Sequence, residues 1–392
     1  MSGGAPLIGV VNAGSSSLKF ALYEDDTRML SGQVEGIGVR PAMSARSANG
    51  EPVPGLDMGR TPPATPADAL MALLPWLRDR LGGRWIAAIG HRVVHGGPNH
   101  EGPQRVTPAL LDELAKLSAL APLHQPHNLA PIRAALAGSP DLPQVACFDT
   151  AFHRTMPPVV QAFALPVACM ARGIRRYGFH GLSYEYIASR LPDVAPGIAE
   201  GKVIVAHLGN GASLCAMQDR KSVATTMGFS ALDGLPMGTR CGELDPAVVL
   251  HLIRSEGMTP EQVEDMLYRR SGMLGLSGIS SDFRDLLASP DPRARFALSV
   301  FVHRVARHIG SLAAALGGLD GLIFTAGVGE NAAPVRSDIC KACAWLGLEF
   351  DAEANEARRG LISRPGSRVV AHVIPTDENL MIARQTRAVL GT

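Results

Sequence analysis

The chain has 392 residues with a formal net charge of +1, and 46% of its residues are hydrophobic against 19% charged. This length and composition predict a globular protein of two domains, each large enough to bury a core. The balanced charge gives no general attraction to nucleic acid or to an anionic membrane. No apolar run approaches the roughly 18 residues of a membrane span, and the N-terminus lacks the pattern of a secretory signal. Because the six scattered cysteines also fit reduced thiols, we expect a cytoplasmic protein without nucleic-acid or membrane partners.

Residues 7–23 predict two strands joined by a small polar loop. The apolar run Leu7–Val11 ends at Asn12, and a second apolar run begins at Leu18. The loop between them holds a glycine and three serines, which allow close backbone approach and offer hydroxyl donors. Such a loop suits phosphoryl oxygens, although it has neither the ending of a P-loop nor the strand-to-helix setting of a dinucleotide site. From this stretch alone, a serine-rich hairpin turn is an equal alternative.

The next segments alternate helical and strand patterns. Apolar residues at helical spacing predict helices over 70–81 and from Pro108 onward, the second with Thr107 as its N-cap. A short apolar strand at 86–89 runs into a glycine-rich stretch, and a buried-strand pattern at 145–148 ends at Asp149. Strands therefore alternate with helices, which indicates an α/β fold.

The second half repeats the opening pattern. Lys202–Leu208 is an apolar strand that enters a small polar loop at 209–213, where Gly209 matches Gly14. A third strand, Gly321–Thr325, enters a glycine loop at 326–331. These matches favour two related halves, and three such loops suit a nucleotide whose phosphates cross a cleft between them. The alternative is that glycine is common at strand ends of α/β proteins generally.

Two arginines, two histidines and two acids stand where they could carry chemistry. Arg92 and Arg240 are flanked by small residues, so that each planar guanidinium could meet a carboxylate or phosphate; a surface ion pair is the alternative. His124 and His180 lie in proline- or glycine-rich surroundings, where a structural hydrogen bond is the usual role of a lone histidine. Asp149, after a strand, and Glu378, at a helix start, are candidate ligands for Mg²⁺, although Glu378 could simply complement the helix dipole.

These stretches together resemble the acetokinase family. The resemblance spans Val10 to about Arg384 and rests on motifs in the following order: VVNAGSSSLK (10–19), GHRVVHGG (90–97), FDTAFH (148–153), RRYGFHGLSYEYIA (175–188), HLGNGAS (207–213), MGTRCGELDP (237–246), SSDFRDL (280–286), FTAGVGEN (324–331) and PTDEN (375–379).

The resemblance implies an α/β fold of two duplicated domains, the ribonuclease H-like superfold that acetate and sugar kinases share with heat-shock ATPases and actin. The active site is then expected in the interdomain cleft. We expect an N-terminal domain over 1–150, on which the C-terminal helix 380–392 packs back, and a nucleotide-binding domain over 151–379. The implied reaction is Mg²⁺-dependent (with Mn²⁺ as an alternative), reversible transfer from ATP to acetate, giving ADP and acetyl phosphate, by a homodimer.

By resemblance, specific residues acquire roles. Arg92 and Arg240 hold acetate and the phosphoryl oxygens, His180 and His124 assist, and Asp149 orients an arginine or the metal shell. Asn12 and Glu378 hold the metal. The small pocket for the methyl group is expected to be formed by Val94, Leu123 and Phe179, with Ala231 at its wall. The nucleotide is expected to bind Asn12, Ser15, Ser17, Lys19, His207, Leu208, Gly209, Asn210, Gly211, Asp282, Phe283, Arg284, Gly327, Val328, Gly329, Glu330 and Asn331.

One departure from the family pattern concerns the acyl pocket. Ala231 stands where the family commonly has a proline before the MGTR stretch. A slightly larger pocket would weaken the preference for acetate over propionate, because one methylene is worth only ~1–3 kcal/mol. A propionate or short-chain acyl kinase is therefore one alternative, and a non-catalytic nucleotide-binding protein on the same fold is the other. For an enzyme, we expect direct in-line transfer, since ionised acetate needs no covalent intermediate.

Overall fold

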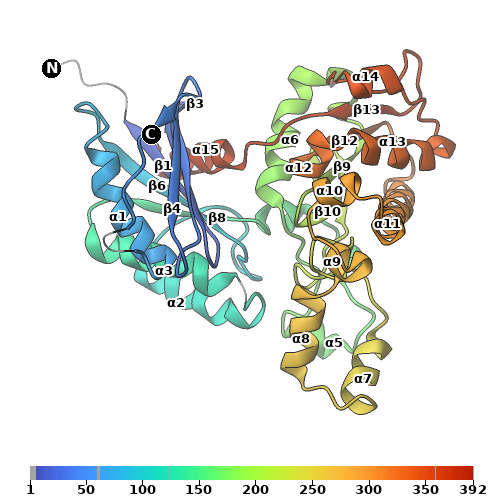
Figure 1. The fold of residues 1–392 in the computed structure, drawn as a ribbon, viewed down its shortest axis with the longest axis horizontal. Coiled ribbons are helices and arrows are strands. Elements are labelled where there is room, and N and C mark those ends of the chain that lie inside the picture. The colour runs from blue at the N-terminus through green and yellow to red at the C-terminus, as the bar shows by residue number, and fades with distance from the viewer. Residues whose placement is uncertain (1–5, 60–61, 123, 358, 392) are drawn as a thin grey trace. The chain divides into compact units, whose positions relative to one another are not determined.

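The structure is a computed structural model that describes residues 6–59, 62–122, 124–357 and 359–391 (Figure 1). The chain forms two compact units. Unit 1 contains the residues up to Phe152 together with the segment from Asp377 onward, and unit 2 runs from His153 to Thr376.

Unit 1 is built on a mixed sheet whose eight described strands have the order β5-β4-β3-β2-β1-β6-β8-β7. β1 pairs antiparallel with β2 and parallel with β6, and β6 pairs parallel with β8. The predicted strand, loop and strand at 7–23 are confirmed as β1 and β2. The strands span β1 Leu7–Ala13, β2 Leu18–Glu24, β3 Thr27–Glu35, β4 Ala42–Ser47, β5 Pro52–Val53, β6 Ile86–Val93, β7 Gln104–Arg105 and β8 Gln144–Phe148.

The helices of unit 1 are α1 Pro66–Arg78, α2 Pro108–Lys116, α3 Gln125–Gly138 and α15 Glu378–Leu390. Thr107 is confirmed as the N-cap of α2, because its side chain accepts from the backbone of Leu110. The helix expected over 70–81 lies earlier along the chain. It starts at Pro66, because Thr65 and Asp68 form a capping box that satisfies donors of the first turn.

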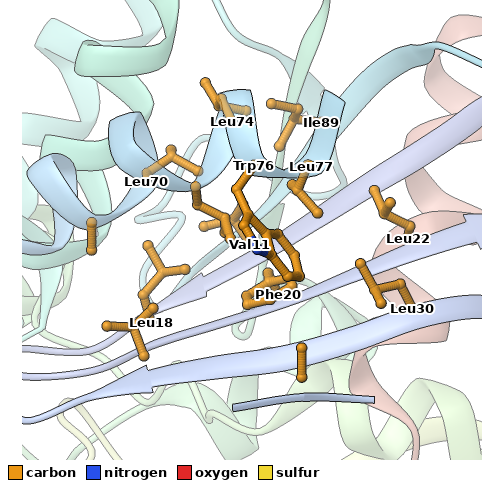
Figure 2. Close-up of a cluster of buried hydrophobic side chains, with 14 of the residues drawn as sticks. Val11, Leu18, Phe20, Leu22, Leu30, Leu70, Leu74, Trp76, Leu77 and Ile89 are labelled. Atoms are coloured by element: carbon orange, nitrogen blue, oxygen red, sulfur yellow. The ribbon is translucent and has the colours of Figure 1, made fainter. Parts of the chain in front are cut away.

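One hydrophobic core of unit 1 lies between α1 and one face of the sheet. Figure 2 shows Trp76 of the helix reaching to Phe20 on the strands, in a cluster that also contains Leu70 and Leu74. Trp76 meets Phe20 of β2 edge to face, with ring centroids 6.1 Å apart. Aromatic pairs prefer this geometry, and the packing holds the sheet that carries Asn12 and Arg92.

α15 packs on β1, β6 and β8 through a close approach at Gly90. A Cβ at this glycine would overlap the side chains of Thr386 and Ile382. The missing side chain thus lets the C-terminal helix lie directly against the β6 backbone (Figure 1).

Gly90→Ala is therefore expected to lower the free energy of unfolding by roughly 1–3 kcal/mol, because an added methyl must displace the packed α15. Urea unfolding measures the change. Gly102→Ala is the matched control, since a Cβ at Gly102 meets nothing within 4 Å. Equal stability of the two variants would contradict this account of α15 packing.

Unit 2 repeats the central part of the first sheet. Its five described strands have the order β11-β10-β9-β12-β13, with β9 antiparallel to β10 and parallel to β12. The same order and directions occur in β3-β2-β1-β6-β8, which confirms the expectation of two related halves. The strands span β9 Lys202–Leu208, β10 Ala212–Gln218, β11 Lys221–Thr225, β12 Gly321–Thr325 and β13 Val370–Val373.

Helices make up much of the rest of unit 2. Thr259 and Gln262 form a capping box at the start of α8. Among the described residues, none of the helices of either unit is both long and apolar enough to cross a membrane. The bounds in unit 2 are α4 Pro158–Gln161, α5 Val167–Ala171, α6 Gly181–Val194, α7 Pro246–Arg254, α8 Pro260–Arg269, α9 Gly272–Ser277, α10 Phe283–Ala288, α11 Pro292–Leu316, α12 Ala326–Asn331, α13 Ala333–Ala342 and α14 Ala352–Glu356.

The prediction of a third glycine loop at 326–331 is wrong, because these residues form the short helix α12. The carboxylate of Glu330 accepts a hydrogen bond of 2.9 Å from the backbone of Ala326 and one of 3.2 Å from that of Thr376. Glu330 thereby satisfies a backbone donor at the start of the helix, and two glycines do not prevent helix formation in so short a segment.

Candidate active site

The first set of functional side chains lies at one edge of the unit 1 sheet. Asn12 is near the end of β1, Arg92 near the end of β6, and Asp149 directly follows β8. Because these three strands are parallel neighbours, their carboxyl ends meet, and this edge is where α/β folds commonly bind ligands. Glu378 is the first residue of α15.

The Arg92 guanidinium is held by hydrogen bonds to both carboxylate oxygens of Asp149. Its Nε donates to Oδ1 at 3.0 Å and its Nη2 donates to Oδ2 at 2.6 Å, while Nη1 lies 3.4 Å from Asn12 Oδ1. Burial acts to lower the pKa of Arg92, but the negative charges of Asp149 and Glu378 raise it above its usual value. Arg92 is consequently a permanent cation in a fixed orientation.

A cavity of about 190 Å³ adjoins this arginine. Six residues predicted from the sequence line it, together with Ala13, Gly14 and Asn128; the six are Asn12, Ser17, Lys19, Arg92, Val94 and His124. Ser15 lies exposed on the same loop and is absent from this lining. The predicted Leu123 lies outside the described residues.

Asn128 is a residue of this cavity that the sequence interpretation missed. Its side-chain amide donates to the carbonyl of Ala13 at 2.6 Å and accepts from the backbone of Val94 at 3.0 Å. Asn128 thus joins the end of β1, where the loop at 14–17 begins, to the residue that directly follows β6. The sequence feature that could have indicated Asn128 is its place four residues after His124, in the same proline-rich stretch.

The second set of side chains lies in unit 2 around His180. This residue is the N-cap of α6 and has a left-handed backbone with φ of 59°. Its Nδ1 lies 2.8 Å from the hydroxyl of Ser213, and its ring stacks on His207 with centroids 4.2 Å apart. His207 Nδ1 in turn contacts the hydroxyl of Ser183 at 2.8 Å.

Arg240 and His180 both lie beside Gly211, in the loop between β9 and β10. A Cβ placed on Gly211 would be 3.2 Å from His180 Nε2 and 4.0 Å from Arg240 Nη1, so both groups border this glycine. Arg240 Nη1 donates to the carbonyl of Ala231 at 3.1 Å. Ala231, predicted from the sequence as an acyl-pocket residue, therefore also positions this guanidinium through its backbone.

The segment that carries Ala231 is itself held by Arg176. The Arg176 guanidinium donates to the carbonyls of Met227 at 2.9 Å and Thr226 at 3.1 Å, and it pairs with Asp233 at 3.3 Å. A buried carbonyl needs such a donor, and one arginine supplies several carbonyls here.

His153 supports the turn that precedes His180. One ring nitrogen contacts the Ser222 hydroxyl and the other the carbonyl of Phe179, each at 2.9 Å. Its ring also fills the space beside Gly178, where a Cβ would lie 2.6 Å from the imidazole. Burial lowers the pKa of His153 to about 4.

A larger cavity of about 710 Å³ in unit 2 brings together three segments that the sequence predicted for nucleotide binding. Predicted residues that are absent from its lining include Leu208, whose side chain is buried in β9, and Glu330, whose carboxylate holds α12. The sequence interpretation missed Leu287, Ala332 and Ser281 beside the predicted residues. The lining comprises Gly209, Asn210, Ser281, Asp282, Phe283, Arg284, Leu287, Gly327, Val328, Asn331 and Ala332.

Two lining residues of this cavity have additional structural contacts. Phe283 packs edge to face on Phe301 of α11, with centroids 4.7 Å apart. Asp282 caps α10 and binds the exposed Arg284, whose hydrogen bond lowers the pKa of Asp282 to about 2. The cavity rim therefore carries a cation and an anion that are paired with each other.

A duplicated sheet, a glycine-lined cavity and arginines at loop and strand ends are features of the α/β phosphotransferases. A search of protein families matches the Acetokinase family over residues 7–384, and the chain belongs to that family.

Known relatives agree with this assignment. The chain is 53% identical over 384 residues to the acetate kinase of Rhodopseudomonas palustris (strain ATCC BAA-98 / CGA009), with 96% of each chain covered. The solved acetate kinase of Porphyromonas gingivalis is 36% identical, with a TM-score of 0.88 over 98% of this chain and all of that one. A propionate kinase from Francisella tularensis is similar to the same degree, with 36% identity, equal coverage and a TM-score of 0.91.

The buried His153 predicts an acid-sensitive fold. Its pKa of about 4 lies below the 6.5 of an unfolded histidine, so the unfolded chain takes up the proton first as pH falls. As the pH falls from 6.5 to 4, His153 is expected to lower the free energy of unfolding by up to about 1.4 kcal/mol per pH unit. Above pH 6.5 it is expected to have no effect on the free energy of unfolding.

Urea unfolding at several pH values measures this slope. His153→Gln should have a shallower loss of stability below pH 6.5 than the native protein. His303→Gln is the control for the loss of an imidazole, because this histidine is exposed on α11. Identical slopes in all three proteins would contradict the assignment to His153.

Proposed function

We propose that this protein transfers the γ-phosphoryl group of ATP to acetate, reversibly, to give ADP and acetyl phosphate. The observation that carries the proposal is the 190 Å³ cavity beside Arg92, which combines a fixed guanidinium with the apolar side chain of Val94. A planar fork suits a carboxylate, and a small apolar surface suits the methyl group. Leu123, Phe179 and Ala231 are proposed as further acyl-site residues on the resemblance alone.

The nucleotide is proposed to bind in the 710 Å³ cavity of unit 2. The exposed Gly327 and the half-buried Gly209 bring backbone close to that space, where nothing bulky would displace phosphate oxygens. Ser15, Ser17 and Lys19 of the loop between β1 and β2 are proposed, on the resemblance, to bind phosphate oxygens.

The transfer needs charge stabilisation more than proton chemistry. Acetate is ionised at neutral pH, so its oxygen attacks phosphorus directly and no general base is required. Arg240 and the Nε2 side of His180 are proposed to stabilise negative charge on the transferring group, while Arg92 orients the carboxylate. The transfer is proposed to be direct and in line, without a phosphorylated protein intermediate.

The oxygen donors of unit 1 fit a magnesium ion. Asn12 Oδ1, whose contact with Arg92 is long at 3.4 Å, and the Glu378 carboxylate would hold it, whereas both oxygens of Asp149 accept shorter hydrogen bonds from Arg92. Within the described ranges, no group of three or more His, Cys, Asp or Glu side chains could hold a metal by itself. That sparse donor set suits Mg²⁺, or Mn²⁺, because magnesium takes most of its ligands from water and phosphate. When bound, the cation neutralises charge on the phosphates of ATP.

The acyl substrate is tested by initial rates with ATP, Mg²⁺ and either acetate or propionate, with the acyl phosphate trapped by hydroxylamine. We expect a higher kcat/KM for acetate. Arg240→Ala should lower kcat by at least about 100-fold while ATP still binds, because the variant loses a charge that acts on the transferring group. Arg293→Ala is the control, since Arg293 is an exposed arginine paired with Asp291 at the start of α11.

Two outcomes would change this conclusion. Equal or faster turnover of propionate would identify a short-chain acyl kinase, and the chain is also similar to a propionate kinase. No acyl phosphate from either acid, with intact ATP binding, would favour a non-catalytic nucleotide-binding protein.

We further propose that the protein is a homodimer that associates through unit 2. The segment around α4 and α5 exposes large apolar side chains, of which Val159 is 81% and Val167 87% exposed. A cluster of this kind on a folded surface is typical of a protein interface, and a second copy of the chain is the partner that the resemblance implies.

Val167→Asp is expected to convert the dimer to a monomer, because a carboxylate would be desolvated at the interface. Sedimentation velocity or light scattering measures the mass. Val39→Asp is the matched control, since Val39 is 92% exposed and lies in unit 1. A dimer that persists in the Val167 variant would exclude this segment as the interface.

A further inference from the structure

We propose that Ser213 and Tyr184 are positioning residues that hold His180 as a neutral imidazole with its proton on Nε2. The proposal deepens the function given above, since it assigns the form in which His180 meets the transferring phosphoryl group. It rests on three hydroxyl and imidazole groups that contact one another inside unit 2.

The Ser213 hydroxyl lies between two partners. His180 Nδ1 is 2.8 Å away and the Tyr184 hydroxyl 2.5 Å away. Ser213 is fully buried in β10, and Tyr184 is fully buried on α6, one turn after His180. Sheet and helix therefore hold this hydroxyl pair in place behind the imidazole.

The chemistry of the two hydroxyls sets the direction of the hydrogen bonds. A serine hydroxyl has one proton, so Ser213 donates to either His180 or Tyr184. A phenol is the more acidic group and the better donor, and burial raises the pKa of Tyr184 well above its usual value, so that it stays protonated. Tyr184 accordingly donates to Ser213, and Ser213 donates to His180 Nδ1.

This direction decides where the His180 proton lies. A ring nitrogen that accepts a hydrogen bond has no proton, so the proton of the neutral ring is on Nε2. Nε2 is the atom that borders Gly211 and faces the same turn as Arg240 Nη1. The result is a fixed N–H donor beside a guanidinium, two groups that complement the oxygens of a phosphoryl group.

The neighbouring ring is held differently. Ser183 donates its hydroxyl proton to Thr376 at 3.0 Å, so its oxygen accepts from His207 Nδ1. His207 thus has its proton on Nδ1, the opposite nitrogen from His180. Two imidazolium rings stacked at 4.2 Å would repel each other, which disfavours a positive charge on both rings at once.

The test is ¹⁵N NMR of histidine-labelled full-length protein without substrates, using two-bond correlations that distinguish the two tautomers. His180→Gln assigns the signals by their loss. We expect the native spectrum to show His180 protonated on Nε2. Tyr184→Phe and Ser213→Ala should increase the Nδ1–H form, whereas Ser183→Ala should leave the His180 signals in place and alter those of His207.

Kinetics provide the second readout. Tyr184→Phe is expected to lower kcat about 10-fold and Ser213→Ala about 100-fold, with little change in KM for ATP, because the donor acts on the transition state. Ser213→Thr keeps a hydroxyl and should restore both the tautomer and most of kcat. Tyr186→Phe, on the same helix, is the control for loss of a phenol.

Three results would overturn the proposal: a native His180 protonated on Nδ1, a native His180 protonated on both nitrogens, or a Tyr184→Phe variant with unchanged tautomer and kcat. Failure of the proposed function is a separate observation, namely that the native protein forms no acyl phosphate. The tautomer spectra are recorded without substrate and decide the present proposal in either case.

Discussion

The ion pair between Arg92 and Asp149 is the constraint on which the unit 1 site depends. Three parallel strands end together, so an arginine on one of them meets a carboxylate that follows its neighbour, with hydrogen bonds of 2.6 to 3.1 Å to both of its oxygens. Both groups are removed from water to a large degree, so neither would be tolerated there alone. The pairing leaves one side of the guanidinium directed to Asn12 and the small cavity. Sheet topology thus decides the orientation of the candidate carboxylate-binding group.

Unit 2 starts from the same arrangement of strands but uses different groups. Its first strand also ends in a small polar loop, at 209–211, which is shorter than the predicted 209–213 because β10 already begins at Ala212, and this loop borders both the larger cavity and His180. The segment 326–331 after β12 is the short helix α12 rather than an open loop, and Glu330 accepts a hydrogen bond from a backbone N–H of its first turn. Duplication therefore preserved the sheet order, while side chains after each strand diverged. The same scaffold presents a fixed arginine in one unit and a histidine pair in the other.

The candidate transition-state groups are held largely by neutral hydrogen-bonding partners. Arg240 donates to the Ala231 carbonyl, Arg176 holds the segment that carries this carbonyl, and Ser213 holds His180. Buried hydroxyls and carbonyls need hydrogen-bond partners. Each hydrogen bond of this kind restricts the functional side chain to fewer rotamers. Orientation is set in advance of binding, which suits a reaction that depends on electrostatic stabilisation.

The sequence by itself determined the alternation of strands and helices, the cap at Thr107, and the motifs that identify the family, because these depend on neighbours within a few residues. It also singled out Arg92, Asp149, His180 and Arg240. Only the tertiary structure decided the roles of Asn128, Tyr184, Ser213 and the Ala231 carbonyl, and that Glu330 builds a helix where a loop was expected. These contacts join residues far apart in the chain, and Asn128 donates to a carbonyl 115 positions away. Every residue has a backbone carbonyl, so the residue type does not show which carbonyl binds a functional side chain. A single buried hydroxyl belongs to no repeating pattern in the sequence, so its role also follows only from how the chain packs.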